Sequence, residues 1–352
     1  MNEALHALIY LHLAISVTMM ARLTALLSLL TAASVVHSSV IPAPRTNTLP
    51  RNEDDNDTPL PLIIWHGLGD NYQADGLAAV AKLADDINPG TLVYLIHLDE
   101  DGGADKTATF LGNLTEQIDK VCEDLAAHPI LSTAPAVDAL GFSQGGQFLR
   151  GYIERCNFPP VRSLVTLGSQ HNGISEFQRC GDGDWLCKGW QGLLRSNTWS
   201  AFVQSRVIPA QYYRDPNPDA YQRYLESSNF LADINNERAE KNPKYKENME
   251  KLEKFVMYVF EDDEVVIPKD SSWFTEVNGT EVTLLKDRDL YKEDWLGLRT
   301  LDKKGALEFR STPGGHMNIL QTLLEDIFTA YYGPFGRKFS TSNIEHPFQQ
   351  EL

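Results

Sequence analysis

The stretch VDALGFSQGGQFLR, residues 137–150, joins a short apolar run to a helix-forming segment through a glycine-rich turn. Residues 141–145 fit the pattern Gly-x-Ser-x-Gly, in which a sharp strand-to-helix turn lifts a serine hydroxyl above the edge of a sheet. Small neighbours on both sides let the strand and the helix approach closely. We therefore interpret Ser143 as a candidate nucleophile; the alternative is an ordinary glycine-rich turn between a strand and a helix.

Strands and helices alternate on both sides of this turn. Continuous apolar runs predict strands at 60–65, 91–96, 136–142, 162–169, 254–260 and 306–310. Apolar residues at helical spacing predict helices at 75–86, 107–127, 145–155 and 316–332. Alternation of this kind produces parallel βαβ units, so we expect an α/β fold with a mostly parallel central sheet.

The alternation also suggests the domain organisation. One α/β domain is expected at 59–332, interrupted between the serine and the next strand by a helical insertion at about 174–250. An insertion of this length is expected to pack on its own and to have a role. The tail at 333–352 has the composition of a poorly ordered segment.

The N-terminal region has the layout of a secretory leader. Residues 1–40 are interpreted as a signal peptide, with Arg22 and an apolar run following Met20, or as a longer signal-anchor that starts earlier. If the signal is cleaved, the mature chain is expected to have no transmembrane span. The Pro-rich and then acidic residues 41–58 are expected to form a disordered linker.

Two further features fit the secretory route. Triplets of the form Asn-x-Ser/Thr make Asn56, Asn113 and Asn278 candidates for N-glycosylation. The chain has four cysteines, and an even number behind a signal suggests two disulfides. Cys180 and Cys187 enclose a short turn-rich loop and are expected to pair, which leaves Cys122 with Cys156. The alternative is four reduced, buried cysteines in a cytosolic protein.

Charge and motif content exclude several classes of function. The formal net charge is −17, which is unfavourable for binding nucleic acid because phosphates require a basic surface. The cysteine spacing does not fit a zinc site, and the glycine-rich loop at 66–70 lacks both common phosphate-binding patterns. We therefore expect no metal and no organic cofactor.

A serine nucleophile requires a base, and the triad of this fold runs in the order serine, acid, histidine. His316 follows the last predicted strand, lies in a glycine-rich loop and is our candidate base. His171 precedes every candidate acid, and His346 falls in the tail. The alternative for His316 is a surface loop histidine beside a helix start.

The acid is expected at the carboxyl end of the strand at 254–260. Asp263 is our candidate, with Asp262 as the neighbour that could replace it and a solvated acidic loop as the alternative. An oxyanion hole needs two backbone N–H groups. Gln144, which follows the nucleophile, and Leu68 of the 66–70 loop are the candidate donors, whereas His66 is expected to orient that loop.

Together these residues resemble one family, the lysosomal palmitoyl-protein thioesterases of type 1, which have the α/β-hydrolase fold. The segments GFSQGGQFLR, GSQHNG, RVIPAQYYRDP, NFLADINNER and EKFVMYVF carry the resemblance, which extends over about residues 60–330. By position, the resemblance implies Ser143 as nucleophile, Asp263 as acid and His316 as base. An adjacent cysteine pair that the family has after the 66–70 loop is absent here, so we expect that loop to be less constrained.

The resemblance implies hydrolysis of long-chain fatty acyl thioesters, typically of palmitate, on cysteines of proteins or peptides, in a lysosome or vacuole. Part of the insertion is then expected to line an acyl groove, with candidates Trp190, Leu194, Phe202, Val207 and Ile208. The alternative is that these residues form only the core of the insertion.

Two other functions share these features. A lipase or carboxylesterase acting on oxyesters would use the same catalytic residues. A non-catalytic protein could retain the fold for carrying lipid, although the complete triad argues against that interpretation.

Overall fold

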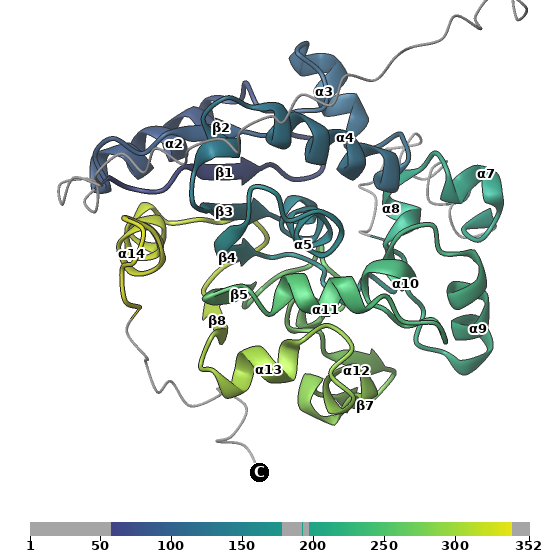
Figure 1. Ribbon diagram of the computed structural model, residues 1–352. Helices are drawn as coiled ribbons and strands as arrows, with labels where there is room; N and C mark the ends of the chain where they lie inside the picture. Colours follow the sequence, from purple (N-terminus) through teal and green to yellow (C-terminus); the bar gives the residue numbers. More distant parts are fainter. Residues whose placement is uncertain (1–57, 178–191, 193–196, 340–352) are drawn as a thin grey trace, which may run out of the picture. The chain divides into compact units, whose positions relative to one another are not determined.

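The computed structural model describes residues 58–177, 192 and 197–339, all within the compact unit formed by Asn52–Leu352 (Figure 1). The strands of its central sheet are β1 (Leu62–Trp65), β2 (Val93–Leu95), β3 (Val137–Phe142), β4 (Val161–Leu167), β5 (Lys254–Phe260) and β8 (Leu307–Thr312). The longer helices are α2 (Asp75–Ile87), α4 (Leu114–Ala127), α5 (Gln144–Arg155), α9 (Pro218–Ser227) and α14 (Gln321–Tyr331).

The central sheet has six strands in the order β2-β1-β3-β4-β5-β8, and every neighbouring pair is parallel. Strands β1 and β3 to β5 are buried along nearly their whole length, as their continuous apolar sequences predict. The predicted α/β-hydrolase fold with a mostly parallel sheet is confirmed. A separate two-stranded antiparallel ribbon, β6 (Glu276–Asn278) and β7 (Glu281–Thr283), was not predicted.

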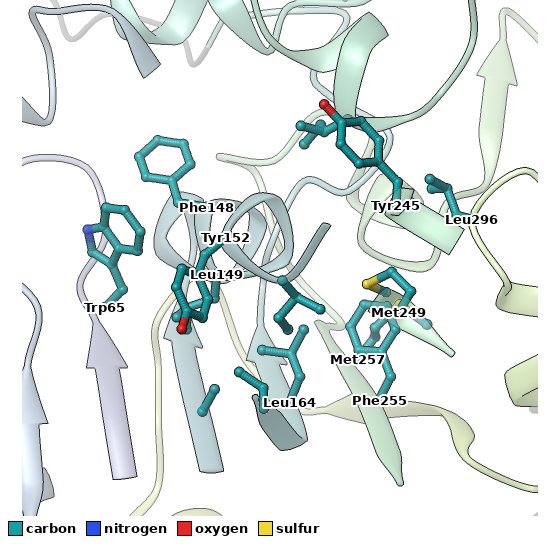
Figure 2. Packing of buried hydrophobic residues seen from close by; sticks show 14 of the residues in the cluster. Trp65, Phe148, Leu149, Tyr152, Leu164, Tyr245, Met249, Phe255, Met257 and Leu296 are labelled. Carbon is teal, nitrogen blue, oxygen red and sulfur yellow. The ribbon is translucent and has the colours of Figure 1, made fainter. Parts of the chain in front are cut away.

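Helices cover both faces of the sheet. Along β1, Leu62 and Ile64 pack into a core layer under α2 and α14, whereas Ile63 and Trp65 point to the opposite layer under α4 and α5. Figure 2 shows this second layer, with Phe148 of α5 beside Trp65; their rings meet edge to face at 5.4 Å. Because the strands are buried on both faces, the sheet forms a rigid platform for the loops at its carboxyl edge.

The helix predicted over 107–127 begins later than expected. A short helix, α3 (Gly102–Ala108), comes first, and α4 starts at Leu114 because the Asn113 side chain accepts a hydrogen bond from the Thr115 amide. Asn113, a candidate glycosylation site, is therefore a helix cap, whereas Asn278 is exposed in the β6–β7 ribbon.

The helix predicted over 316–332 also starts later, at Gln321. Residues 316–320 form a loop, because Met317 takes a left-handed conformation with φ of 60° and the Ile319 amide bonds back to the Met317 carbonyl. This difference matters for function, since it leaves His316 on a loop at the carboxyl edge of the sheet.

The described part of the insertion consists of mostly short helices joined by irregular segments. These helices are α7 (Ala201–Gln204), α8 (Ile208–Gln211), α9, α10 (Leu231–Ile234) and α11 (Pro243–Met249). After β5 the chain adds α12 (Asp289–Lys292) and α13 (Leu298–Lys303), which were not predicted. Predictions on Asn56, Cys180, Cys187, Trp190 and Leu194 concern positions outside the described residues.

A disulfide and a pair of side-chain hydrogen bonds connect the ends of several elements. A disulfide joins Cys122 of α4 to Cys156 at the end of α5. Near the start of β4, Arg162 donates to the carbonyl oxygens of Gly333 and Pro334, so the described start of the tail contacts the domain. No helix within the described ranges is long and apolar enough to cross a membrane.

Candidate active site

Ser143 occupies a strained turn between β3 and α5. Its φ of 52° and ψ of −125° lie outside the regions that residues other than glycine normally adopt. The turn is held by hydrogen bonds from the Ser143 amide to the Leu167 carbonyl and from the Gly146 amide to the Ser143 carbonyl. Strain of this kind costs about 1–3 kcal/mol and persists only where the surrounding structure enforces it, as at functional sites.

Three glycines allow this turn to pack. A Cβ added to Gly141 would lie 2.1 Å from the Gly146 Cα, so the strand and the helix touch through their backbones. A Cβ added to Gly145 would lie 2.3 Å from the Trp65 carbonyl oxygen, which brings α5 against β1. The Gly-x-Ser-x-Gly pattern therefore reflects backbone contacts that any side chain would block.

The structure brings the three candidate triad residues together. His316 Nε2 lies 3.0 Å from Ser143 Oγ, and His316 Nδ1 lies 2.7 Å from Asp263 Oδ2. A carboxylate can only accept a hydrogen bond, so Nδ1 carries the proton and Nε2 is left to accept from the serine hydroxyl. The geometry fits a serine that is activated by a base and a base that is oriented by an acid.

Loops after neighbouring strands position the acid and the base. Asp263 follows β5, and its other oxygen, Oδ1, accepts hydrogen bonds from the amides of Val265 and Val266. Asp262, the alternative acid, is exposed, and its amide bonds the Gly314 carbonyl in the loop that carries His316. The structure therefore distinguishes between Asp263 and Asp262 as the candidate acid, a choice that the sequence had left open.

The 66–70 loop lies directly against the serine. A Cβ added to Gly67 would be 3.1 Å from the Ser143 Cβ, and Leu68 lines the same cavity as Ser143. Gln144 opens α5, where the first backbone N–H groups of a helix have no intrahelical acceptor. The two candidate oxyanion donors therefore flank the serine.

Thr109, which no sequence motif singled out, links the two segments that carry these candidate donors. The Gly69 amide donates to the Thr109 hydroxyl at 2.9 Å, and the Gln144 side chain donates to the Thr109 carbonyl at 3.3 Å. The Tyr212 hydroxyl donates to the other end of the Gln144 side chain at 3.2 Å. Thr109 is buried, so it fixes the 66–70 loop relative to the start of α5.

His66 is tied to a partner that the sequence did not indicate. Its Nε2 donates to the buried Asp105 of α3, which also accepts from the amides of Tyr72 and Leu98. Burial alone would raise the pKa of Asp105, but these hydrogen bonds outweigh burial and hold the pKa below its usual value. One carboxylate thus anchors three segments around the 66–70 loop.

His171 is a core residue. It is fully buried, stacks on Phe274, accepts a hydrogen bond from Arg150 and contacts the Thr166 hydroxyl. Burial, together with the charge of Arg150, lowers its pKa well below the usual value, so the ring stays neutral. This placement agrees with its exclusion as the base.

A cavity of about 1330 Å³ opens over the serine. Ser143 and His316 line it between two groups of apolar side chains, one near the insertion and one near α2. Of the groove candidates that the structure describes, Val207 lines the cavity. Phe202 is 65% exposed with Arg206 over its ring, and Ile208 points into the core, so these two predictions are corrected.

The cavity wall also contains residues that the sequence analysis did not select. They include Phe110, Leu111 and Phe177, and Leu77, Val80 and Leu83 of α2. Among the described residues, no group of three or more His, Cys, Asp or Glu side chains is arranged to hold a metal ion.

Comparison with known proteins agrees with this geometry. A family model described as palmitoyl protein thioesterase matches residues 61–316. The chain belongs to this family. The resemblance inferred from the sequence is thereby confirmed, and the matched range contains Ser143, Asp263 and His316.

Curated relatives support the membership. Palmitoyl-protein thioesterase 1 of Caenorhabditis elegans is 37% identical over 278 residues, covering 78% of this chain and 92% of that protein. Palmitoyl-protein thioesterase 3 of Dictyostelium discoideum is 31% identical, covering 78% of this chain and 90% of that protein. Human lysosomal thioesterase PPT2 is 30% identical, covering 70% of this chain and 78% of that protein. Among solved structures, a lipase-esterase related protein from Clostridium acetobutylicum aligns with a TM-score of 0.37 at 15% identity, covering 77% of this chain and 95% of that chain.

Proposed function

We propose that the protein is a serine hydrolase that removes long-chain fatty acyl groups, such as palmitate, from cysteine thioesters of proteins or peptides. The observation that carries the proposal is the hydrogen-bonded chain Ser143–His316–Asp263, which opens into a large apolar cavity. Membership of the palmitoyl protein thioesterase family supports the thioester as the bond that is cleaved.

The mechanism follows from the positions of these groups. Ser143 Oγ attacks the thioester carbonyl carbon while His316 Nε2 takes the hydroxyl proton, and Asp263 stabilises the resulting imidazolium. The amides of Leu68 and Gln144 receive the oxyanion. The carbon–sulfur bond then breaks, His316 returns the proton to the cysteine sulfur, and the acyl group remains on Ser143. Water, deprotonated by His316, hydrolyses this ester and releases the fatty acid.

The cavity supports a long acyl chain as the substrate. Its lining is largely apolar, and each buried methylene group contributes about 0.8 kcal/mol. Several buried methylenes therefore outweigh a single hydrogen bond, which contributes about 1 kcal/mol net. The binding free energy of an acyl chain thus depends mainly on its length, and a short-chain ester is expected to be a poorer substrate.

We further propose that the protein acts in the lysosome or vacuole, reached through the secretory route. Relatives named as lysosomal thioesterases support this location, and the disulfide between Cys122 and Cys156 fits an oxidising compartment. The disulfide Cys180–Cys187, glycosylation at Asn56, Asn113 and Asn278, and signal removal within residues 1–40 belong to the same proposal.

The test is hydrolysis of a palmitoyl-cysteine peptide by wild type and two sets of variants. Ser143→Ala is expected to lower kcat by about 10⁴-fold or more and to abolish labelling by a fluorophosphonate. Asp263→Asn is expected to lower kcat strongly, whereas its exposed neighbour variant Asp262→Asn keeps near wild-type activity.

Two outcomes would contradict the proposal. A folded Ser143→Ala variant that still releases palmitate excludes the serine as nucleophile. Faster turnover of a matched palmitoyl oxyester than of the thioester would make the protein a lipase or carboxylesterase instead.

A further inference from the structure

The cavity has two halves that meet at Ser143. At about 1330 Å³ it exceeds the roughly 300–1,000 Å³ typical of a small-ligand site. One half is built by the insertion and the chain before α4, and the other by α2 and the loop that leads into α14. Figure 1 shows α2 and α14 on one side of the sheet and α8 far from them, beyond α5. A substrate centred on the serine therefore extends in two directions.

The insertion half is largely apolar, although Lys106 and Thr107 of the chain before α4 also line the cavity. Phe110, Leu111, Phe177 and Val207 line this half. The segments that carry Leu111 and Val207 are joined by backbone hydrogen bonds and by a bridge between these two residues. Such a wall suits an alkyl chain, which has no polar group to satisfy.

The α2 half has a mixed wall. Val80 and Leu83 lie beside Gly76 and Ala79, which leave room, and the charged pair Lys82–Asp86 stands at its border. The two charged side chains are 74% and 54% exposed, so this part of the wall is solvated. An alkyl chain gains little beside hydrated ions, whereas a polypeptide can hydrogen-bond there.

The reaction chemistry gives a second, independent reason to place the acyl chain in one half of the cavity and the leaving group in the other. In the tetrahedral intermediate, the oxyanion faces Leu68 and Gln144, and the leaving sulfur must lie within reach of His316 Nε2 for proton return. Met317 and Ile319, which follow His316 closely in the chain, line the α2 half of the cavity. The leaving group therefore points into that half, and the acyl chain is directed into the insertion half.

We propose that the half-cavity between α2 and residues 317–324 is a subsite for the polypeptide that flanks the acylated cysteine. This inference rests on the proposed thioesterase function and adds to it where the protein part of the substrate binds. The wall of this subsite then contributes to selection among acylated proteins.

The test compares two thioesters with the same acyl group. One is a palmitoyl-cysteine peptide, and the other is the palmitoyl thioester of N-acetylcysteamine, which lacks a polypeptide. Ala79→Trp fills the α2 half, and the matched control is Ala78→Trp, an exposed position on the same helix outside the cavity lining. The readout is the ratio of kcat/KM for the peptide to kcat/KM for the small thioester. Ala79→Trp is expected to lower this ratio about tenfold or more, whereas Ala78→Trp keeps the wild-type ratio.

A reciprocal measurement fixes which half holds the acyl chain. With N-acetylcysteamine thioesters, Leu111→Trp is expected to lower the preference for palmitoyl over octanoyl by several-fold, and Ala79→Trp to preserve it. The proposed subsite is excluded if Ala79→Trp leaves the ratio of kcat/KM for the peptide to kcat/KM for the small thioester unchanged. It is also excluded if Ala79→Trp loses the preference for palmitoyl over octanoyl. If wild type hydrolyses neither thioester, it is the proposed function that fails, so the two failures are distinguishable.

Discussion

At the scale of single residues, the candidate site depends on contacts that hold backbone amides in place. Thr109 accepts from the Gly69 amide through its hydroxyl and from the Gln144 side chain through its carbonyl. It touches none of the reacting atoms, so it acts through the residues it positions. Oxyanion stabilisation requires donors that are already aligned when charge develops, and Thr109 connects the two segments that carry the proposed donors.

Replacement of Thr109 by valine removes one of these contacts while keeping the shape of the side chain. The Gly69 amide then loses its acceptor, and the loop can shift. A net hydrogen bond of about 1 kcal/mol predicts a fall in kcat of about five- to tenfold, with KM nearly unchanged. Steady-state kinetics on the palmitoyl thioester of N-acetylcysteamine measure kcat and KM separately.

Two further variants separate positioning from general damage. Thr109→Ser keeps the hydroxyl and is expected to restore most of kcat, whereas Thr133→Val, at an exposed position, is expected to leave kinetics unchanged. Equal losses in Thr109→Val and Thr109→Ser would exclude the hydroxyl contact as the cause.

At the scale of elements, the strand–turn–helix unit is the part of the molecule most closely determined by its sequence. Gly145 packs against the carbonyl oxygens of Trp65 and His66, with an added Cβ only 2.3 and 2.4 Å away. Backbone atoms of a central strand cannot move aside for a methyl group. This contact fixes the distance from α5 to β1, and thereby from Ser143 to the 66–70 loop.

We therefore expect Gly145→Ala to destabilise the domain by several kcal/mol, more than most single substitutions, which cost about 0.5–3 kcal/mol. The control is Gly76→Ala, because a Cβ there meets nothing within 4 Å and helix propensity favours alanine by about 1 kcal/mol. Urea unfolding curves measure both. A Gly145→Ala protein as stable as Gly76→Ala would contradict the close contact.

Elements differ in how well the sequence alone predicts them. Buried strands such as β3 and β5 appear as continuous apolar runs, and the order of serine, acid and histidine follows the order of the strands that carry them. In contrast, α3 has the sequence GGADKTA, which contains no apolar period. Asp101 caps it, which is a local signal, but a cap without an apolar period does not identify a helix. The contacts of Asp105 with the Tyr72 and Leu98 amides exist only in the folded chain.

The walls of the cavity were predicted less well for a related reason. Ala79, Lys82 and Asp86 lie on the exposed side of α2, and in the sequence they are typical of a solvated helix face. Their role in the cavity depends on the later segment 317–324, which packs nearby only in the folded chain. Conversely, Ile208 lies in an apolar stripe of the sequence that predicted a place in the acyl groove, but its side chain points into the core.

At the scale of the whole molecule, buried carboxyl groups make folding depend on pH. Burial raises the pKa of Glu154 to about 8, although the charge of its partner Arg150 opposes the shift. Burial likewise raises the pKa of Asp138 to about 7 against the opposing effect of Arg162. Both groups take up protons more readily in the folded protein than in the unfolded chain.

The sign of the effect favours acidic conditions. Between the unfolded value of 4.5 and the folded value of about 8, the folded state holds more protons at Glu154, so stability falls as pH rises through this window. Each fully linked group contributes on the order of 1 kcal/mol per pH unit. His171 opposes this trend below about pH 6.5, because its lowered pKa keeps the folded state from binding a proton that the unfolded chain binds. Two carboxyl groups outweigh one imidazole, so the free energy of unfolding is expected to be higher at pH 5 than at pH 7.5, which fits the proposed acidic compartment.

Glu154→Gln tests this linkage directly, because an amide of similar shape cannot ionise. Urea unfolding at about pH 5 and about pH 7.5 is expected to show a smaller loss of stability in the variant than in wild type, and the remaining dependence comes from Asp138 and, with the opposite sign, from His171. Glu247→Gln, at an exposed position, is the matched control and is expected to keep the wild-type dependence. A Glu154→Gln variant with an unaltered pH dependence would show that Glu154 is ionised in the fold and paired with Arg150 as a salt bridge.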